Sequence, residues 1–457
     1  MKFIIYGAGQ VGRTISKYLS DEKHQVVLID ENKEILDELS SKMDIQTITG
    51  AAVDPSILEE ADAQSADMLI SVTRNDERNM MACVEAHTLF NVPFNICRVQ
   101  SDFYGGPQLE KLQKSLSVNV MISTEQEVAK SIFRNLKIPS ALDLIPFDKE
   151  KISFLGLKCL QNAPLAGIKL EDFHEVIPDF SVAIACVVRE GKVIYPSADL
   201  YIMPEDEVYF MVENRYVRRI LELLGHERNT ARKLVIFGGG CKLGMTFAQL
   251  LEDSDFDGYV TFIEKNEKEA LCLAEKLKDV LVINGDGLSE DILSEVHVDT
   301  ADVTVALSED DEENILFSLI AKKKGVSKSF ALIQKPLYNS LTSGLGLDVA
   351  VDPNVVVIAT ILRYIQKGRI MAVYPLRSGL GELMEVEALS TSKITGRPLG
   401  EIKMPDGVWV VGILRDNRLV IGTSDLVINA GDIVFCLAKN GRTKDVEALF
   451  SAGLFFF

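Results

Sequence analysis

Three glycines at fixed spacing follow a short apolar run near the start of the chain. Residues 3–6 read Phe-Ile-Ile-Tyr, and the pattern G-x-G-x-x-G then places Gly7, Gly9 and Gly12. Gly7 permits a tight turn, Gly9 lets a ligand approach the backbone, and Gly12 lets the following helix pack against the strand. The free amides at the start of that helix, together with its dipole, attract phosphate.

An acidic residue lies at the distance from this turn that nucleotide binding requires. A second apolar run, residues 26–29, ends on Asp30, which is 18 residues after Gly12. A carboxylate there can accept hydrogen bonds from an adenosine ribose and would repel a 2′-phosphate, so NAD(H) is favoured over NADP(H). Strand, turn, helix and acid occur in order, which favours a nucleotide site over a bare structural turn. The site would include Gln10 and Val11.

The strand, the glycine turn and the acid occur a second time past the middle of the chain. The second copy consists of residues 234–237, Gly239, Gly240, Gly244 and Glu264. Residues 68–73 also match residues 303–308, and Asn79 matches Asn314 at an offset of 235. Equal order at a nearly constant offset predicts a tandem duplication.

The two turns differ in one respect. When their last glycines are aligned, Cys241 stands against Gly9, and the second turn contains one additional residue. A side chain at the point of closest approach reshapes the phosphate cradle. The first half is therefore the stronger candidate for nucleotide binding.

Short apolar strands alternate with helical patterns in residues 1–138 and again in residues 229–369. This alternation is typical of a parallel sheet with helices on both faces. In residues 139–228 and 370–457, glycine, proline and acidic turns separate short strands of alternating polarity. The predicted fold class is α/β, in which each half is a Rossmann-like parallel-sheet domain followed by a small α+β domain. The ligand crevice is expected at the carboxyl ends of the first strands.

An apolar stripe precedes each small domain. The stripes consist of Val128, Ile132 and Leu136 in the first half and Val357, Ile361 and Ile365 in the second. Each set recurs every four residues and therefore occupies one face of a helix. Such a helix can pack on the sheet of its own domain or cross to a partner domain, and the sequence leaves both open. Because the stripes offer more apolar surface than one sheet needs, we expect a homo-oligomer.

Composition narrows the class of protein. The formal net charge of −19 argues against binding to nucleic acid or to an anionic lipid surface. No apolar run approaches the roughly 20 residues of a membrane span. The first strand begins within two residues of the N-terminus, which leaves no room for a signal peptide. We therefore expect a cytoplasmic protein.

No metal site is expected. The five histidines are far apart, and the seven cysteines form no C-x-x-C pair. The acidic run from Glu309 to Glu313 lacks the central glycine and alternating oxygens of a calcium loop. It follows Ser308 and is predicted to start a helix, where negative charge is stabilising.

The order of these features resembles the RCK (KTN) domains that regulate potassium conductance. The resemblance rests on the first glycine turn, Asp30, the run Thr73-Arg74-Asn75-Asp76-Glu77 leading to Asn79, Arg98-Val99 and the trailing small domain. The duplication, over essentially the whole chain, resembles the cytosolic subunits of bacterial Trk potassium-uptake systems. Ordinary dehydrogenases lack this domain order.

The resemblance implies a regulatory subunit that binds NAD(H), or ATP and ADP, and gates a membrane potassium-conducting Trk subunit. It also implies a ring, and hence a homo-oligomer such as a tetramer, peripheral on the cytoplasmic face of the inner membrane through that partner. Carried over by position, Thr73 and Arg98 border the ligand beside the glycine turn and Asp30. Thr73 is also placed to cap the following helix.

The resemblance is incomplete in a different way in each half. The family's Gly-Asp after the third strand is Gly50-Ala51 in the first half, whereas the second half keeps Gly285-Asp286 but has the altered turn. An NAD-dependent oxidoreductase is the alternative, because a shared fold does not fix function. No Tyr-x-x-x-Lys pair occurs, since Tyr364 and Lys367 are one residue too close, and no acid-base cluster is evident. We therefore expect no enzymatic activity.

Overall fold

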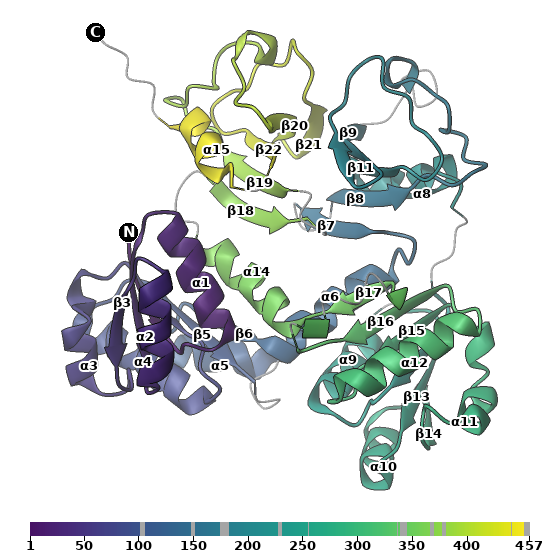
Figure 1. Cartoon of the computed structure of the whole chain (residues 1–457), viewed down its shortest axis with the longest axis horizontal. Helices are drawn as coiled ribbons and strands as arrows, with labels where there is room; N and C mark the ends of the chain where they lie inside the picture. Colours follow the sequence, from purple (N-terminus) through teal and green to yellow (C-terminus); the bar gives the residue numbers. More distant parts are fainter. Residues whose placement is uncertain are drawn as a thin grey trace. The chain divides into compact units, whose positions relative to one another are not determined.

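The computed structural model describes the chain except residues 101–105, 148–150, 174–181, 227–230, 255, 336, 339–344, 366–369, 377–380, 440 and 452–457 (Figure 1). The chain divides into two compact units, Met1–Leu136 with Ala231–Ile361 and Lys137–Thr230 with Leu362–Phe457. Each unit therefore combines equivalent parts of the two halves. Among the described helices, none is long and apolar enough to cross a bilayer.

The first unit begins with a six-stranded parallel sheet in the order β3-β2-β1-β4-β5-β6. Its strands are β1 (Lys2–Tyr6), β2 (Gln25–Asp30), β3 (Gln46–Thr49), β4 (Met68–Ser71), β5 (Asn95–Val99) and β6 (Val120–Ser123). The helices are α1 (Gln10–Asp21), α2 (Lys33–Lys42), α3 (Pro55–Glu60), α4 (Asp76–Phe90), α5 (Gly106–Ser115) and α6 (Thr124–Leu136). Phe3, Ile4 and Ile5 of β1 are fully buried, which is typical of parallel strands between two helical layers.

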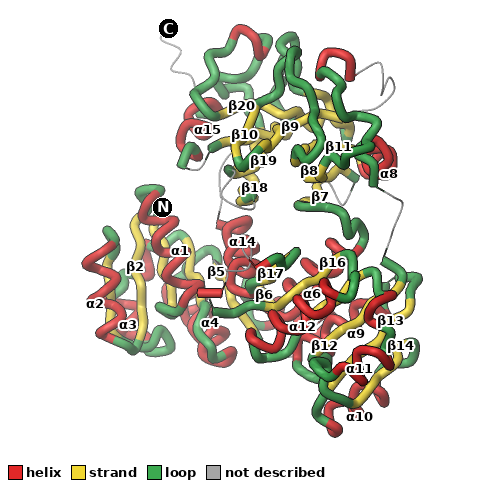
Figure 2. The backbone as a smooth tube through the Cα atoms, turned by 45° about the vertical axis from the view of Figure 1, so that its right-hand side comes forward, coloured by secondary structure: helices red, strands yellow, loops and turns green. Residues whose placement is uncertain are grey.

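A second sheet in the same unit repeats this order as β14-β13-β12-β15-β16-β17 (Figure 2). Its strands are β12 (Lys233–Phe237), β13 (Tyr259–Glu264), β14 (Val280–Asn284), β15 (Val303–Ala306), β16 (Lys328–Leu332) and β17 (Val349–Val351). The helices are α9 (Lys242–Glu252), α10 (Glu267–Lys276), α11 (Glu290–Glu295), α12 (Asp311–Lys323) and α14 (Pro353–Ile365). The identical strand order confirms the predicted duplication.

Helix α6 crosses from the first parallel-sheet domain to the second. Val128, Ile132 and Leu136 are buried in one core with Phe247 of α9 and with Ile236 of β12. Of the two arrangements that the sequence left open, α6 therefore adopts the crossing one. Its apolar stripe helps to build the core of the other half.

Helix α14 contacts the first domain in turn. The side-chain amide of Asn354 donates to Oε1 of Gln10 at 3.2 Å, and the hydroxyl of Thr360 donates to Glu127 of α6 at 3.5 Å. Val357 and Ile361, two members of the second apolar stripe, are fully buried. Helix α14 of the second half therefore also contacts the first parallel-sheet domain, at the glycine turn.

The second unit contains two small domains with one five-stranded sheet each, in the orders β10-β9-β11-β8-β7 and β18-β19-β22-β20-β21. The first comprises β7 (Asp143–Phe147), β8 (Ile152–Lys158), β9 (Val182–Arg189), β10 (Lys192–Ile194), β11 (Glu207–Glu213) and α8 (Asn214–Leu223). The second comprises β18 (Ile370–Pro375), β19 (Glu382–Glu387), β20 (Val408–Arg415), β21 (Arg418–Ile421), β22 (Ile433–Ala438) and α15 (Thr443–Phe450). Their described strand pairs are antiparallel. The predicted fold class is confirmed.

The two small domains share a core, and each contains an ion pair between an arginine and a buried aspartate. Phe147 of the first packs edge to face against Phe435 of the second, with ring centroids 5.0 Å apart. In the first domain Arg189 binds Asp206 through two hydrogen bonds of 2.7 and 2.8 Å. Arg415 and Asp432 form the equivalent pair in the second. Both aspartates are almost fully buried, so each needs its arginine partner.

Candidate nucleotide-binding site

The first glycine turn joins β1 to α1 at the carboxyl edge of the first sheet. Gly7 has a φ of +111°, which other residues rarely adopt, and its amide donates to the carbonyl of Ile29 at 2.9 Å. A Cβ on Gly12 would lie 1.8 Å from the carbonyl oxygen of Gly7, so this close packing requires glycine. A Cβ on Gly9 would meet no described atom within 4 Å. Space is therefore open at the expected point of approach.

Asp30 lies beside this turn. One carboxylate oxygen accepts from the amide of Ala8 at 2.6 Å, and the other accepts from the amide of Asn32 at 2.8 Å. A carboxylate offers about four acceptor positions, so two remain for donors such as ribose hydroxyls. Gly9 is the N-cap of α1, and no side chain of the described residues caps the helix there. The first amides of α1 are thus available to an anion.

The side chains of the other turn residues are used within the protein. Val11 is buried in the core, and Gln10 accepts the hydrogen bond from Asn354 on α14. Arg13, one turn further along α1, donates from Nε to the carbonyl of Ala8 at 2.7 Å. Gln10 and Val11 therefore offer backbone amides to a ligand, while Arg13 adds positive charge beside the turn.

Asn79 links the ends of β4 and β5. Its Oδ1 accepts from the amide of Thr73 at 3.0 Å and from its hydroxyl at 2.6 Å, and its Nδ2 donates to the carbonyls of Thr73 and Arg98 at 3.0 and 2.9 Å. The two residues expected at the ligand border are thus held by one side chain. The capping role considered for Thr73 is wrong, because Asn75 caps α4 by accepting from the amide of Arg78 at 2.7 Å.

Arg98 is buried at the end of β5, with 8% of its surface exposed. Its Nε donates to the hydroxyl of Thr124, the first residue of α6, at 3.0 Å. Burial lowers the pKa of Arg98, and the carboxylates of Glu125 and Asp76 oppose that shift. The guanidinium keeps its charge because arginine starts from so high a pKa. A positive charge is therefore held at the same edge of the sheet as the glycine turn.

The second half repeats most of this geometry. Gly238 has a φ of +76°, and its amide donates to the carbonyl of Ile263 at 3.0 Å. The carboxylate of Glu264 accepts from the amides of Gly240 and Asn266, both at 2.8 Å. Each of these bonds has an equivalent in the first half, so Glu264 takes the structural place of Asp30.

The additional residue of the second turn lies against the sheet. A Cβ on Gly239 would lie 2.2 Å from the ring of Phe262, and a Cβ on Gly244 would lie 2.4 Å from the carbonyl oxygen of Gly239. Cys241 is the N-cap of α9, as Gly9 is the N-cap of α1. The structure thus confirms that Cys241 corresponds to Gly9.

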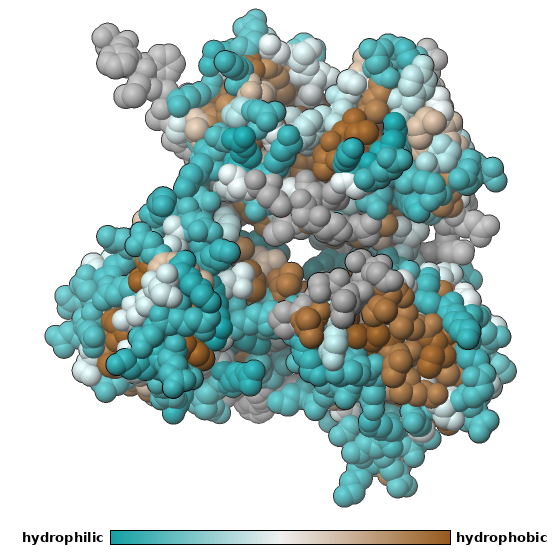
Figure 3. Space-filling model, viewed as in Figure 1, coloured by the Kyte–Doolittle hydropathy of each residue, from teal (hydrophilic) through white to brown (hydrophobic). Residues whose placement is uncertain are grey.

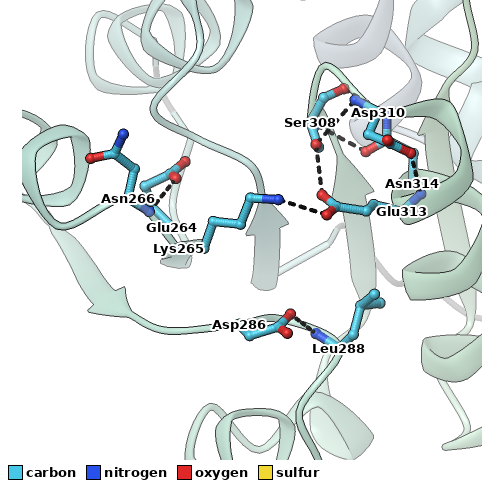
Figure 4. Close-up of polar contacts among 9 residues, drawn as sticks. All are labelled: Glu264, Lys265, Asn266, Asp286, Leu288, Ser308, Asp310, Glu313 and Asn314. Atoms are coloured by element: carbon cyan, nitrogen blue, oxygen red, sulfur yellow. Dashed lines mark hydrogen bonds and ion pairs between the residues drawn. The ribbon is translucent and has the colours of Figure 1, made fainter.

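Asn314 repeats the role of Asn79. Its Oδ1 accepts from the amide of Ser308 at 2.9 Å, and its Nδ2 donates to the carbonyls of Ser308 and Leu332 at 2.7 and 3.0 Å. The hydroxyl of Ser308 also donates to Glu313 at 3.1 Å (Figure 4). The ends of β15 and β16 are therefore joined in the same way as those of β4 and β5.

The acidic run starts α12, as predicted. Asp310 caps the helix by accepting from the amide of Glu313 at 3.0 Å, and the carboxylate of Glu313 pairs with Lys265 at 2.6 Å (Figure 4). Asp286, the acid that the second half keeps after its third strand, accepts from the amide of Leu288 at 2.9 Å. These carboxylates are engaged within the protein.

Sequence reasoning missed the role of two aspartates, Asp76 and Asp311, which hold the loops after β5 and β16. Asp76 accepts from the amide of Gln100 at 2.9 and 3.0 Å, and Asp311 accepts from the amide of Gln334 at 3.0 and 3.1 Å. A signal was present, because each aspartate lies three residues before the duplicated asparagine of its half.

Comparison with known proteins gives consistent matches. The family model for the TrkA-N domain matches residues 3–124 and 234–353, and that for the TrkA-C domain matches residues 383–451. The Trk system potassium uptake protein TrkA of Vibrio alginolyticus is 36% identical over 100% of both chains. The protein of the same name from Haemophilus influenzae is 35% identical, again over 100% of both chains.

Solved structures match the same arrangement. The RCK domain of GsuK superposes with a TM-score of 0.59 at 17% identity, covering 98% of this chain and 94% of that chain. The GsuK channel bound to NAD superposes with a TM-score of 0.60 at 16% identity, covering 98% and 78%. At these identities the match shows the fold alone. The family models and the full-length relatives show that this chain belongs to the TrkA family of potassium uptake proteins.

Proposed function

We propose that the first half binds NAD(H) and that the chain is a regulatory subunit that gates a membrane potassium-conducting Trk subunit. The observation that carries the nucleotide proposal is the open start of α1. Its first amides lack a side-chain cap, the space beside Gly9 is free of described atoms, and Asp30 has acceptor positions left. These are the features that a pyrophosphate and a ribose require.

Each group would have a separate task. The pyrophosphate would lie against the amides that follow Gly9, with Arg13 adding positive charge from α1. The ribose hydroxyls would donate to Asp30, whose orientation is fixed by Ala8 and Asn32. Thr73 and Arg98 would border the ligand from the ends of the next strands. ATP and ADP share the adenosine and the phosphates, so they are expected to compete for the same site.

The relatives support this choice of ligand and role. The full-length relatives are named Trk system potassium uptake proteins, and the GsuK channel of the same fold was solved with NAD. None of these names is that of an oxidoreductase. The sequence also lacks a recognisable proton-transfer group beside the site. We therefore propose that bound nucleotide acts as a signal and is not turned over.

A regulator requires its ligand to favour one conformation over another. A tenfold preference at one site corresponds to about 1.4 kcal/mol, and several coupled sites in a ring would add to a usable switch. Helix α14 offers a route by which ligand binding at the glycine turn can affect the second small domain, because Asn354 at its start contacts Gln10 of that turn. From α14 the chain continues directly into the second small domain.

We propose that the chain forms a homo-oligomer, such as a tetrameric ring, at the cytoplasmic face of the membrane. Figure 3 shows apolar side chains gathered over α12 on one face of the second parallel-sheet domain. Leu316 of α12 is 50% exposed, and Leu337, beyond β16, is 71% exposed. Exposed apolar patches are typical of protein interaction sites. Light scattering should give a multiple of the 50.5 kDa chain mass.

Binding is best tested with the full chain, because α6 of the first half is part of the core of the second parallel-sheet domain, and a separated second half would lack it. Titration with NADH, followed by calorimetry, should give saturable binding. Gly9→Ala adds a Cβ at the approach to the phosphates and should weaken binding while leaving the oligomer intact. Absence of saturable binding of NADH, ATP and ADP would contradict the nucleotide proposal.

Gating needs a separate experiment. The purified membrane subunit is reconstituted in liposomes, and potassium flux is measured with and without this protein across NADH, ATP and ADP. Flux should depend on the nucleotide with the native chain and lose that dependence with Gly9→Ala. Identical flux with and without the protein under all conditions would end the regulatory proposal.

A further inference from the structure

We propose that each chain binds one nucleotide, in its first half, because Cys241 and a reversal of charge close the second glycine turn to phosphate. The inference deepens the proposed nucleotide binding and rests on it. Three differences between the equivalent turns support this inference.

The first difference is the helix cap. The thiol of Cys241 accepts from the amide of Gly244 at 3.3 Å and lies 3.0 Å from the carbonyl of Leu307, to which it can donate. Burial raises the pKa of this thiol to about 11, so it stays protonated at neutral pH. The equivalent amide of α1 belongs to Gly12 and has no side-chain cap. In α9 the protein itself therefore occupies a donor that a phosphate would use.

The second difference is the loss of positive charge. Strand register and the matched bonds align three arginines of the first half with uncharged or acidic residues of the second. The equivalent pairs are Arg13 and Met245, Arg74 and Glu309, and Arg98 and Leu332. Arg74 lies near enough to Arg98 to lower its pKa, after the larger effect of burial. Each of the three charges would attract phosphate, and none has a positive counterpart.

The third difference is an added carboxylate. Glu269 of α10 occupies the position of Ile35, and a Cβ on Gly240 would lie 2.4 Å from its Oε2. Partial burial raises the pKa of Glu269, and the nearby charges of Glu264 and Glu309 raise it further. The carboxylates of Glu264, Glu269 and Glu309 thus gather beside the second turn. At the equivalent positions the first half has one carboxylate, that of Asp30. Like charge of this density repels a pyrophosphate.

Two lysines near the second turn do not replace the positive charge that the three arginines give the first half. Lys242 replaces Gln10 at the first position of α9, where its side chain is exposed to solvent. Lys265 replaces Glu31, but its ammonium is paired with Glu313 at 2.6 Å. The equivalent pair in the first half, Glu31 with Arg78 at 2.8 Å, has the opposite polarity, so neither pair changes the local net charge.

The test is calorimetric titration of the full chain with NADH, using a blocking and an opening variant. Gly9→Asp places a carboxylate in the open space at the N-cap, a position with extended backbone where aspartate is preferred, so the fold is retained. The native chain should bind one NADH per chain, and Gly9→Asp should lose at least a hundredfold in affinity. The triple variant Cys241→Gly, Glu269→Ile and Glu309→Arg gives these three positions the residues that the first half has there.

Added to the Gly9→Asp background, the triple variant should restore one site per chain. Two sites in the native chain, or binding that survives Gly9→Asp, would overturn the inference. A triple variant that binds no more NADH than its background would overturn it as well. If the native chain binds no NADH, the proposed function fails on its own, while gain of a site in the triple variant would still support closure of the second turn.

Discussion

The two glycine turns share a frame of hydrogen bonds and differ in the groups that we propose face a ligand. The frame consists of Asp30 and Glu264, Asn79 and Asn314, and Asp76 and Asp311, each pair making equivalent bonds to backbone groups. The differing groups are the helix cap and the charges around it. The residues of the frame therefore occur in both halves, whereas the arginines that we propose attract phosphate, Arg13, Arg74 and Arg98, occur in the first half alone.

The difference separates residues that stabilise the fold from residues that we propose bind a ligand. Asn79 and Asn314 are fully buried and bind several backbone groups, so losing either leaves those groups without partners. Arg74 is exposed, so replacing it costs the fold little. A duplicated chain thus separates the two kinds of residue without any other sequence.

The largest expected effect tests whether the two copies are independent. Ile132→Ala removes a buried side chain from α6 and should destabilise the core around α9 by about 2–5 kcal/mol. Hydrogen exchange followed by mass spectrometry should show a greater loss of protection in α9 than in α1. Lys130→Ala, on the exposed side of the same helix, is the control. Greater loss in α1 would mean that α6 serves its own domain instead.

The next largest effect is expected from removing the asparagine of the shared frame, Asn79 or Asn314. Asn79→Ala and Asn314→Ala should each lower the free energy of unfolding by about 2–4 kcal/mol, because each leaves buried backbone donors and acceptors unsatisfied. Chemical denaturation measures both. Only Asn79→Ala should also weaken NADH binding. Equal weakening by the two variants would place ligand groups in both halves.

A smaller effect is expected from replacing the acidic residue beside each glycine turn, Asp30 or Glu264. Asp30→Ala should weaken NADH binding by about 1–3 kcal/mol, since ribose hydroxyls lose their acceptor. Glu264→Ala, the matched variant, should leave the affinity unchanged. Calorimetry measures both affinities, and unchanged affinity of Asp30→Ala for NADH and ATP would remove Asp30 from the site.

The smallest effect concerns the pKa of Glu269. Its pKa is raised in the folded chain, so the charged form is disfavoured there, and stability falls as the pH rises through that pKa. Glu269→Gln should therefore raise the thermal midpoint slightly at pH 7 and have no such effect near pH 3.5, where the carboxyl is protonated in both states. Thermal unfolding at the two pH values measures this. A gain in thermal midpoint that is larger at pH 3.5 than at pH 7 would contradict burial and like charge as the cause of the raised pKa.

Sequence reasoning succeeded where the signal is local. The glycine spacing, the acid at the end of the second strand and the helix start at Asp310 each depend on residues close together along the chain. The alternation of strands and helices, repeated at a constant offset, was enough to predict the duplicated fold. Thr73 was wrongly considered as a cap because Asn75, two residues on, has the same capping chemistry.

Other features depend on contacts between distant segments. The stripe on α6 has the same period whether it packs on its own domain or on the other, so only the tertiary structure decided between them. The correspondence between Arg98 and Leu332 follows from the strand register. The sequence by itself determined the two phosphate-turn frames. Folding decided which helix start remains open, because that depends on where one thiol and several charges lie in space.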